Sequence, residues 1–200
     1  MSSRDTRSAS APLLLLMKGH PGSGKSTLAR LIASNFGITI SDKDDSKDCF
    51  QAAEKQFGSA GAWDLNALSY QVMFRVASSQ LDCGQSVVVD CPLSKLELYQ
   101  QANGIAEQHH AVVVVIECQP RHLDIWKQRL ETRTQECSYS HKPKTWEDLE
   151  ALISRYNKCD EWSWNGSTSI KFHLLLDTSV GTPEEHLAHV TSFLIKKGLV

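Results

Sequence analysis

The residues best suited to chemistry begin with a glycine-rich stretch near the start of the 200-residue chain. It reads Gly19-His20-Pro21-Gly22-Ser23-Gly24-Lys25-Ser26, with Thr27 next. It matches G-x-x-x-x-G-K-[ST], whose glycines let successive backbone N–H groups turn toward phosphate oxygens. Lys25 would reach the β- and γ-phosphates, and the Ser26 hydroxyl would bind Mg²⁺. We therefore expect residues 19–27 to bind the triphosphate of ATP together with Mg²⁺.

A second charged group, with the sequence SDKDDSKD, occupies residues 41–48. Parallel sheets bind ligands beyond the carboxyl ends of their strands, so acids that follow a strand should face the phosphate loop. Asp44 is our candidate for orienting an acceptor hydroxyl and taking its proton. Asp42 could hold Mg²⁺ through water, and Lys47 could contact an anionic group of the acceptor. The alternative is a solvated polar turn that caps the next helix.

A third acid, Asp90, ends the apolar run Val87–Val89. An aspartate in this position binds the water shell of Mg²⁺ in phosphate-loop enzymes. The next residue is Cys91, whereas many motor ATPases have a Glu there to polarise the attacking water. Its absence favours transfer to a bound acceptor over hydrolysis, with Pro92 in an acceptor-side loop. An ordinary strand-end residue is the alternative interpretation of Asp90.

Two arginines, Arg129 and Arg133, are four positions apart in a segment of helical periodicity. This spacing places both guanidinium groups on one flank of the helix. Beside the polar, aperiodic segment 135–144, they could close over the nucleotide and neutralise charge in the transition state. We predict a lid over about residues 129–147 with catalytic Arg129 and Arg133. The alternative is a solvated basic face.

Short apolar runs alternate with helical periodicity along the chain, which positions these residues. Several runs are β-branched without alternation, as in strands that are buried on both faces. The pattern predicts an α/β fold, a doubly wound open parallel sheet of about five strands with helices on both faces. The expected strands are Leu13–Met17, Ile38–Ile40, Ser86–Val89, Ala111–Ile116 and Phe172–Leu176.

Two helix starts carry the capping-box spacing, Ser94 with Glu97 and Thr182 with Glu185. Residues 1–11 are rich in Ser, Arg and Ala, and we expect a mobile N-terminal tail there, followed by a single domain over 12–200. Asn157-Lys158-Cys159-Asp160 matches the guanine-reading N-K-x-D pattern. It follows a helix rather than a strand, so we interpret this match as coincidence.

The composition, with 41% hydrophobic residues and a net charge of −2, is that of an ordinary globular protein. It has no basic excess, so nucleic acid is possible as a partner but not favoured. No apolar run approaches the ~20 residues of a membrane span. The six cysteines form no C-x-x-C pair, which favours a reducing compartment. We expect a cytoplasmic protein, with organelle targeting by the tail left open; oligomeric state is not indicated.

The motifs together resemble the P-loop kinases near the polynucleotide kinases and zeta toxins, and more distantly shikimate and gluconate kinases. The matching segments are KGHPGSGKST, DKDDSK, VVVDCP and RLETR. The resemblance implies an adenylate-kinase-like strand order 2-3-1-4-5, an activating role for Asp44, and lid roles for Arg129 and Arg133. Lys47 stands where the group's D-D-x-R element has Arg. That departure weakens a role in binding 5′ ends, because Lys is a point charge where Arg binds bidentately.

The leading hypothesis is an ATP- and Mg²⁺-dependent kinase that phosphorylates a hydroxyl of a small metabolite. A polynucleotide 5′-hydroxyl kinase is the alternative within catalysis, and it predicts a basic groove beside Asp44. A nucleotide-dependent regulatory switch with weak hydrolysis is the alternative of another class. It would need elements that sense the γ-phosphate, and the chain lacks a D-x-x-G switch motif.

Overall fold

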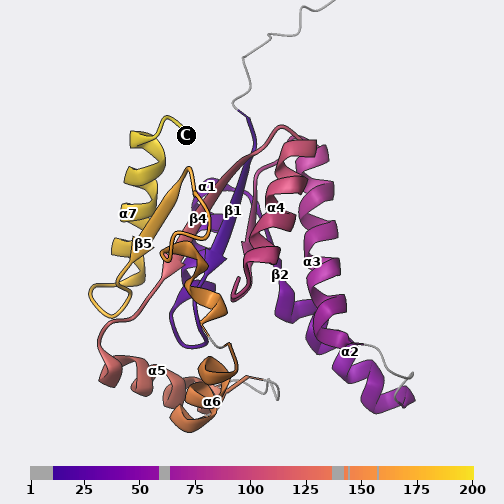
Figure 1. The fold of residues 1–200 in the computed structure, drawn as a ribbon, viewed down its shortest axis with the longest axis vertical. Helices are drawn as coiled ribbons and strands as arrows, with labels where there is room; N and C mark the ends of the chain where they lie inside the picture. Colours follow the sequence, from indigo (N-terminus) through magenta and orange to yellow (C-terminus); the bar gives the residue numbers. More distant parts are fainter. Residues whose placement is uncertain (1–10, 59–63, 137–141, 144, 157) are drawn as a thin grey trace, which may run out of the picture.

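A parallel sheet of five strands organises the chain in a computed structural model. It describes residues 11–58, 64–136, 142–143, 145–156 and 158–200, with the backbone alone at 133–136. The order β2-β3-β1-β4-β5 confirms the predicted doubly wound fold and the strand order that the resemblance implies. The strands are β1 (Leu13–Lys18), β2 (Thr39–Asp42), β3 (Val87–Asp90), β4 (Val112–Cys118) and β5 (His173–Leu176) (Figure 1).

Helices cover both faces of the sheet. They are α1 (Lys25–Phe36), α2 (Lys43–Phe57), α3 (Leu65–Asp82), α4 (Leu96–Gln108), α5 (Leu123–Glu136), α6 (Trp146–Tyr156), the 3₁₀ helix η1 (Cys159–Ser163) and α7 (Pro183–Lys196). Side chains of α1 and α7 share one core with the sheet, and those of α3, α4 and η1 share the other (Figure 1). Within the described ranges, no helix is long and apolar enough to cross a bilayer.

The central strand β1 shows why the apolar runs lack alternation. All six of its residues are buried. Leu14 and Leu16 point into the core on the α3 and α4 face, whereas Leu13, Leu15 and Met17 point toward α1 and α7. Both faces of the strand are covered, so every position is apolar until Lys18.

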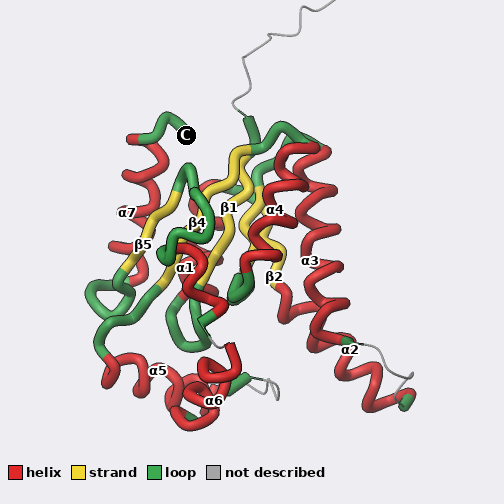
Figure 2. Tube along the Cα trace, viewed as in Figure 1, coloured by secondary structure: helices red, strands yellow, loops and turns green. Residues whose placement is uncertain are grey.

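The carboxyl ends of the strands meet at one edge of the sheet. Asp42 is paired in register with Asp90, and Lys18 with Glu117. The loops that leave these ends run toward α5 and α6, which lie beyond this edge (Figure 2). Trp126, Leu130 and Leu149 form a small separate core between these two helices. The fold thus gathers the predicted site residues at a single edge.

Helix caps account for several element boundaries. The Thr182 hydroxyl accepts from Glu185 N at 3.2 Å and Glu185 Oε2 accepts from Thr182 N at 2.8 Å, which confirms that capping box. The predicted box at Ser94 is wrong, because α4 starts one residue later with Lys95 as an N-cap that makes no side-chain bond. Ser94 is buried instead.

Parts of the predicted tail and lid lie outside the described residues. Residues 1–10 of the tail are not described, nor are 137–141 and 144 of the lid segment. The division into a tail, one domain and a lid therefore stays a prediction.

Candidate functional site

The phosphate loop joins β1 to α1, as the motif requires. Gly22 and Gly24 have φ of 79° and 83°, in the left-handed region that favours glycine. A Cβ at Gly22 would also lie 3.0 Å from both Trp126 Nε1 and Leu130 Cγ. Helix α1 begins at Lys25, so its N-terminal N–H groups open toward the loop. The backbone conformation suits the binding of phosphate oxygens.

Groups from three other parts of the chain hold the loop. Trp126 Nε1 of α5 donates to Pro21 O at 2.9 Å, and the Thr178 hydroxyl, which follows β5, donates to Ser23 O at 2.7 Å. Gly19 N donates to Pro92 O at 3.3 Å. The shape of the loop therefore depends on the packing of α5 and of the segment after β5.

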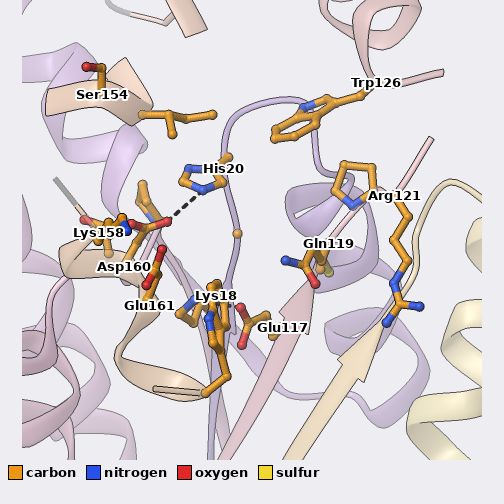
Figure 3. Close-up of a pocket in the computed structure, with 17 residues that line it drawn as sticks. Lys18, His20, Glu117, Gln119, Arg121, Trp126, Ser154, Lys158, Asp160 and Glu161 are labelled. Atoms are coloured by element: carbon orange, nitrogen blue, oxygen red, sulfur yellow. Dashed lines mark hydrogen bonds and ion pairs between the residues drawn. The ribbon is translucent and has the colours of Figure 1, made fainter. Parts of the chain in front are cut away.

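The side chain of His20 contacts an acid outside the loop. Its Nε2 lies 3.0 Å from Asp160 Oδ2 (Figure 3). Its ring also stacks on Trp126 and Tyr156 at centroid distances of 6.0 and 5.6 Å. This hydrogen bond lowers the pKa of Asp160. Asp160 belongs to the N-K-x-D match, whose Asn157 lies outside the described residues. Asp160 contacts the phosphate loop through His20, a role that the sequence interpretation missed.

Two acids with buried carboxylates, Asp42 and Asp90, lie at the carboxyl ends of β2 and β3, each near a basic side chain. Lys25 Nζ lies 4.0 Å from Asp90 Oδ1, and Arg30 Nη2 lies 3.7 Å from Asp42 Oδ2. Both oxygens of Asp90 are buried and accept no hydrogen bond from the described part of the chain. Burial and the charge of Asp90 raise the pKa of Asp42 to about 6. The two negative charges therefore repel each other, and the oxygens of Asp90 have no hydrogen-bond donor among the described residues.

This charge fits a hard divalent cation. Mg²⁺ prefers carboxylate and hydroxyl oxygens and keeps several waters, so it needs one or two carboxylates plus substrate phosphates. No cluster of three His, Cys, Asp or Glu ligands exists among the described residues. Asp42 and Asp90 could supply the carboxylates, and Ser26, which could supply the hydroxyl, lies next to Lys25 in the first turn of α1.

Lys25 borders two cavities of about 690 Å³ each. The first, here the loop cavity, is lined by Gly22, Gly24, Lys25, Ser26, Thr27, Leu28, Arg30, Gln128, Arg129, Thr132, Lys142, Thr178, Pro183 and His186. The second, here the Asp44 cavity, is lined by residues of α2, α3, α4 and α6, by Pro21, Lys25 and Pro92, and by Lys142 and Pro143. Asp44 and Lys47 both line the second cavity, as does Pro92.

Asp44 is held by two lysines. Its carboxylate lies 3.1 Å from Lys43 Nζ and 2.7 Å from Lys142 Nζ. Burial alone would raise the pKa of Asp44, but the two lysines lower it well below its usual range. The neighbouring Asp42 accepts from Asp44 N at 2.9 Å and so caps α2. The segment therefore ends β2 and starts α2 rather than forming a solvated turn, and the roles expected for Asp42 and Asp44 stay predictions.

Arg129 is half-buried against the loop cavity rather than on a solvated face. Its Nη2 donates to Thr178 O at 2.7 Å, whereas its Nη1 is buried with no hydrogen-bond partner among the described residues. Nη1 lies 3.7 Å from the position of a Cβ at Gly24. The side chain of Arg133 lies outside the described residues, so its lid role stays a prediction.

The position of Thr178 could have been anticipated from the sequence. It lies two residues after β5, and residues just beyond the carboxyl ends of parallel strands line the site in this class of fold. The contact of Lys142 with Asp44 had a weaker signal, because it joins segments almost a hundred residues apart. Such pairings depend on how α5 and α6 pack, and no local pattern encodes them.

A third cavity, of about 730 Å³, includes His20 and a buried polar network (Figure 3). Glu117 Oε1 lies 2.7 Å from Lys18 Nζ, and Glu117 Oε2 lies 2.9 Å from His173 Nε2. These partners hold the pKa of Glu117 below its ordinary value although burial would raise it. Through Glu117, the network links β4 to the carboxyl end of β1, just before the phosphate loop, and to β5.

The family of the chain follows from this loop and sheet. A family model described as an AAA domain matches residues 14–158, more than half of the chain. The chain belongs to this AAA domain family. Curated relatives in Mycobacterium tuberculosis and Mycobacterium bovis are uncharacterized proteins that are 29% identical over 127 residues. The match spans 60% of this chain and a quarter of the length of these relatives.

Solved P-loop kinases share the fold of this AAA domain. A candidate kinase from Chloroflexus aurantiacus has a TM-score of 0.67 at 19% identity, covering 92% of this chain and 99% of its own. A gluconokinase from Sinorhizobium meliloti has a TM-score of 0.61 at 15% identity, covering 94% of each chain. Shikimate kinase from Acinetobacter baumannii, in complex with shikimate, has a TM-score of 0.57 at 14% identity, covering 96% and 97%. The resemblance to P-loop kinases is confirmed, and at these identities it concerns the fold.

Proposed function

We propose that this protein is a kinase that transfers the γ-phosphate of ATP to a hydroxyl of a small molecule. The observation that carries the proposal is the place of Lys25, in the wall shared by the loop cavity and the Asp44 cavity. Transfer between two bound substrates needs two adjoining sites with a cation at their junction. The fold shared with gluconokinase and shikimate kinase supports the same activity.

The residues divide into a donor side and an acceptor side. Residues 19–27 would bind the triphosphate, and Arg129 and Lys25 would contact oxygens that gain charge in the transition state. Ser26, Asp42 and Asp90 would hold Mg²⁺. When bound, this ion would neutralise charge on the phosphate oxygens. Arg133 would join Arg129 in the proposed lid.

Asp44 would orient the acceptor hydroxyl. A new O–P bond forms while the bond from the γ-phosphorus to the bridging oxygen breaks, and its electron pair leaves with ADP. Because its pKa is depressed, Asp44 is a weak base, and it would take the hydroxyl proton late, after bonding to phosphorus has made that proton acidic. Lys142 would have to release Asp44 before an acceptor hydroxyl could approach it.

ADP release with and without a small-molecule extract of cells tests the proposal. We expect Mg·ATP to be consumed slowly by the protein alone and many times faster when the extract is added. A rate that is indifferent to the extract would contradict the kinase and would favour the regulatory switch.

One observation favours a second candidate. A polynucleotide 5′-hydroxyl kinase requires a basic groove beside Asp44, and several lysines line the Asp44 cavity. A 5′-hydroxyl oligonucleotide added to the same assay separates the candidates. Stimulation by the oligonucleotide and not by the extract would support the second.

A further inference from the structure

The lining of the Asp44 cavity is strongly cationic. Its basic side chains are Lys25, Lys43, Lys47, Lys95, Lys142 and Arg155, and its acidic ones are Asp44 and Asp64. The whole chain has a net charge of −2, so this imbalance of six against two is local. The basic side chains that line the cavity repel one another, and a bound ligand of negative charge would reduce this repulsion.

Three of these cations have no role on the donor side. Lys47, on α2, and Lys95, at the start of α4, make no ion pair with any described residue. Arg155, on α6, donates through Nε to Ala151 O of its own helix and likewise has no acidic partner there. Lys25, by contrast, lies 4.0 Å from Asp90, and Lys43 and Lys142 bind Asp44. The three free charges come from three different helices around one cavity.

Lys47 is the most constrained of the three. It is half-buried one helical turn after Lys43. Burial and the charge of Lys43 lower the pKa of Lys47, so its surroundings disfavour the ammonium form. Asp44, Asp48 and Asp64 offset this only in part, and an anion beside Lys47 would favour the ammonium form further.

Several of the remaining lining residues carry neutral hydrogen-bonding groups. Asn66, Tyr70 and Gln71 come from α3, Gln101 from α4 and Tyr156 from α6. Burial raises the pKa of Tyr70, so its phenol stays a neutral donor. Amides and phenols of this kind suit the hydroxyl groups of a polar ligand.

Resting on the proposed function, we infer that the acceptor is a small alcohol that also bears a carboxylate, phosphate or sulfate group, which Lys47, Lys95 and Arg155 bind while Asp44 receives the hydroxyl. The cavity volume of about 690 Å³ fits such a molecule. This charge pattern selects acceptors by the anionic group, and neutral polyols of the same size are excluded by the cost of leaving the cations unpaired.

Matched pairs of acceptors test the inference. Each anionic alcohol is compared with a neutral one as a stimulant of ADP release. Gluconate is paired with glucitol. Glycerate and glycerol 3-phosphate are both paired with glycerol, and a nucleoside 3′-monophosphate is paired with its nucleoside. We expect anionic members to stimulate and their neutral partners to be inactive. Stimulation by neutral members to the same extent would overturn the inference while leaving the kinase intact. Stimulation by a 5′-hydroxyl oligonucleotide alone would overturn the small-molecule acceptor.

Substitutions at Lys47 locate the anion. Lys47→Gln should raise the KM of the best anionic acceptor by about tenfold with the KM of ATP unchanged, and Lys47→Glu should raise it further. Lys55→Gln, the same change at an exposed position of α2, is the matched control and should change neither constant. An unchanged acceptor KM in both Lys47 variants would contradict the assignment.

A binding measurement separates the inference from the proposed function. The same pairs are titrated calorimetrically into protein saturated with Mg·AMPPNP, which occupies the phosphate loop. Suppose that anionic members bind, that Lys47→Gln weakens this binding, and that none of them stimulates ADP release from ATP in the separate assay. This result would support the anion site and refute the kinase. Failure of every anionic member to bind or to stimulate would refute the inference.

Discussion

Lys25 is the residue on which both halves of the site depend. It lies in the wall between the loop cavity and the Asp44 cavity, 4.0 Å from the buried carboxylate of Asp90. A lysine in this position contributes to nucleotide binding as well as to transfer, because it contacts the β- and γ-phosphates from the ground state onward.

The substitution Lys25→Ala should therefore abolish the stabilisation by Mg·ATP. Ligand binding to the folded state raises the melting temperature by mass action, and the shift vanishes when affinity is lost. Melting curves of the wild type and the variant, with and without Mg·ATP, measure this. An equal shift in both proteins would remove the phosphate-loop assignment.

Asp42 links the proposed metal site to stability. With its pKa raised to about 6, the folded protein binds a proton at Asp42 more tightly than the unfolded chain does. The contribution of this group to stability therefore rises as the pH falls from about 7 to about 4. The ionised carboxylate at neutral pH destabilises the metal-free protein.

Asp42→Asn removes this charge and keeps the oxygen that caps α2. In EDTA, the variant should be more stable than the wild type at about pH 7.5, by about 1–3 kcal/mol. The advantage should shrink steadily as the pH falls to about 4. Urea unfolding across this range measures the difference, and a difference that does not depend on pH would show that Asp42 titrates normally.

At the scale of elements, α5 both shapes the phosphate loop and supplies an arginine to it. Trp126 donates to Pro21 O and packs on His20, and Arg129 follows one turn later. A change in the position of α5 would therefore reach the loop directly. Through these contacts, nucleotide binding at the loop could change the position of α5, which forms part of the proposed lid.

Trp126→Phe should weaken nucleotide binding by about tenfold, because it leaves the Pro21 carbonyl without its donor. Trp146→Phe is a matched control, since the Trp146 indole donates to the exposed Glu150 on its own helix. Titration with a fluorescent ATP analogue compares the two variants. Equal affinities in both would contradict the role given to α5.

The same scale shows what the sequence could predict. Short apolar runs predicted all five strands, and the signal was most continuous where burial on both faces requires it, in β1, β3 and β4. Helix α2 carried no such signal, since Lys43 is its one buried residue among those described. Its start depends on the Asp42 cap and its course on contact with α3. The capping box of Thr182 formed and that of Ser94 did not, because Ser94 is buried in the fold.

Contacts between residues far apart in the chain could not be predicted from the sequence, for a different reason. The motif predicted where Lys25 and Gly22 would lie, because the loop is encoded locally. The contacts of Asp160 with His20 and of Lys142 with Asp44 join distant segments, and they arise from packing around the sheet edge. The sequence thus predicted where the phosphate loop and Asp44 lie at the sheet edge but not the contacts around them, and the roles of these residues stay predictions.

In the whole molecule, two adjoining cavities lie at the carboxyl edge of the parallel sheet. The loop cavity offers backbone N–H groups and Arg129, and the Asp44 cavity offers a carboxylate surrounded by cations. This division suits transfer from one bound molecule to another rather than hydrolysis. The separation of roles means that donor binding and transfer can be damaged independently.

Asp44→Asn tests this claim most directly. Protein is incubated with γ-labelled ATP, Mg²⁺ and a small-molecule extract. Label in phosphorylated organic products other than nucleotides, separated from inorganic phosphate, is measured together with ATP affinity. The account predicts wild-type nucleotide affinity with transfer reduced by about 100-fold or more. Transfer at the wild-type rate would contradict it, because the carboxylate that faces the cations would then have no part in the reaction.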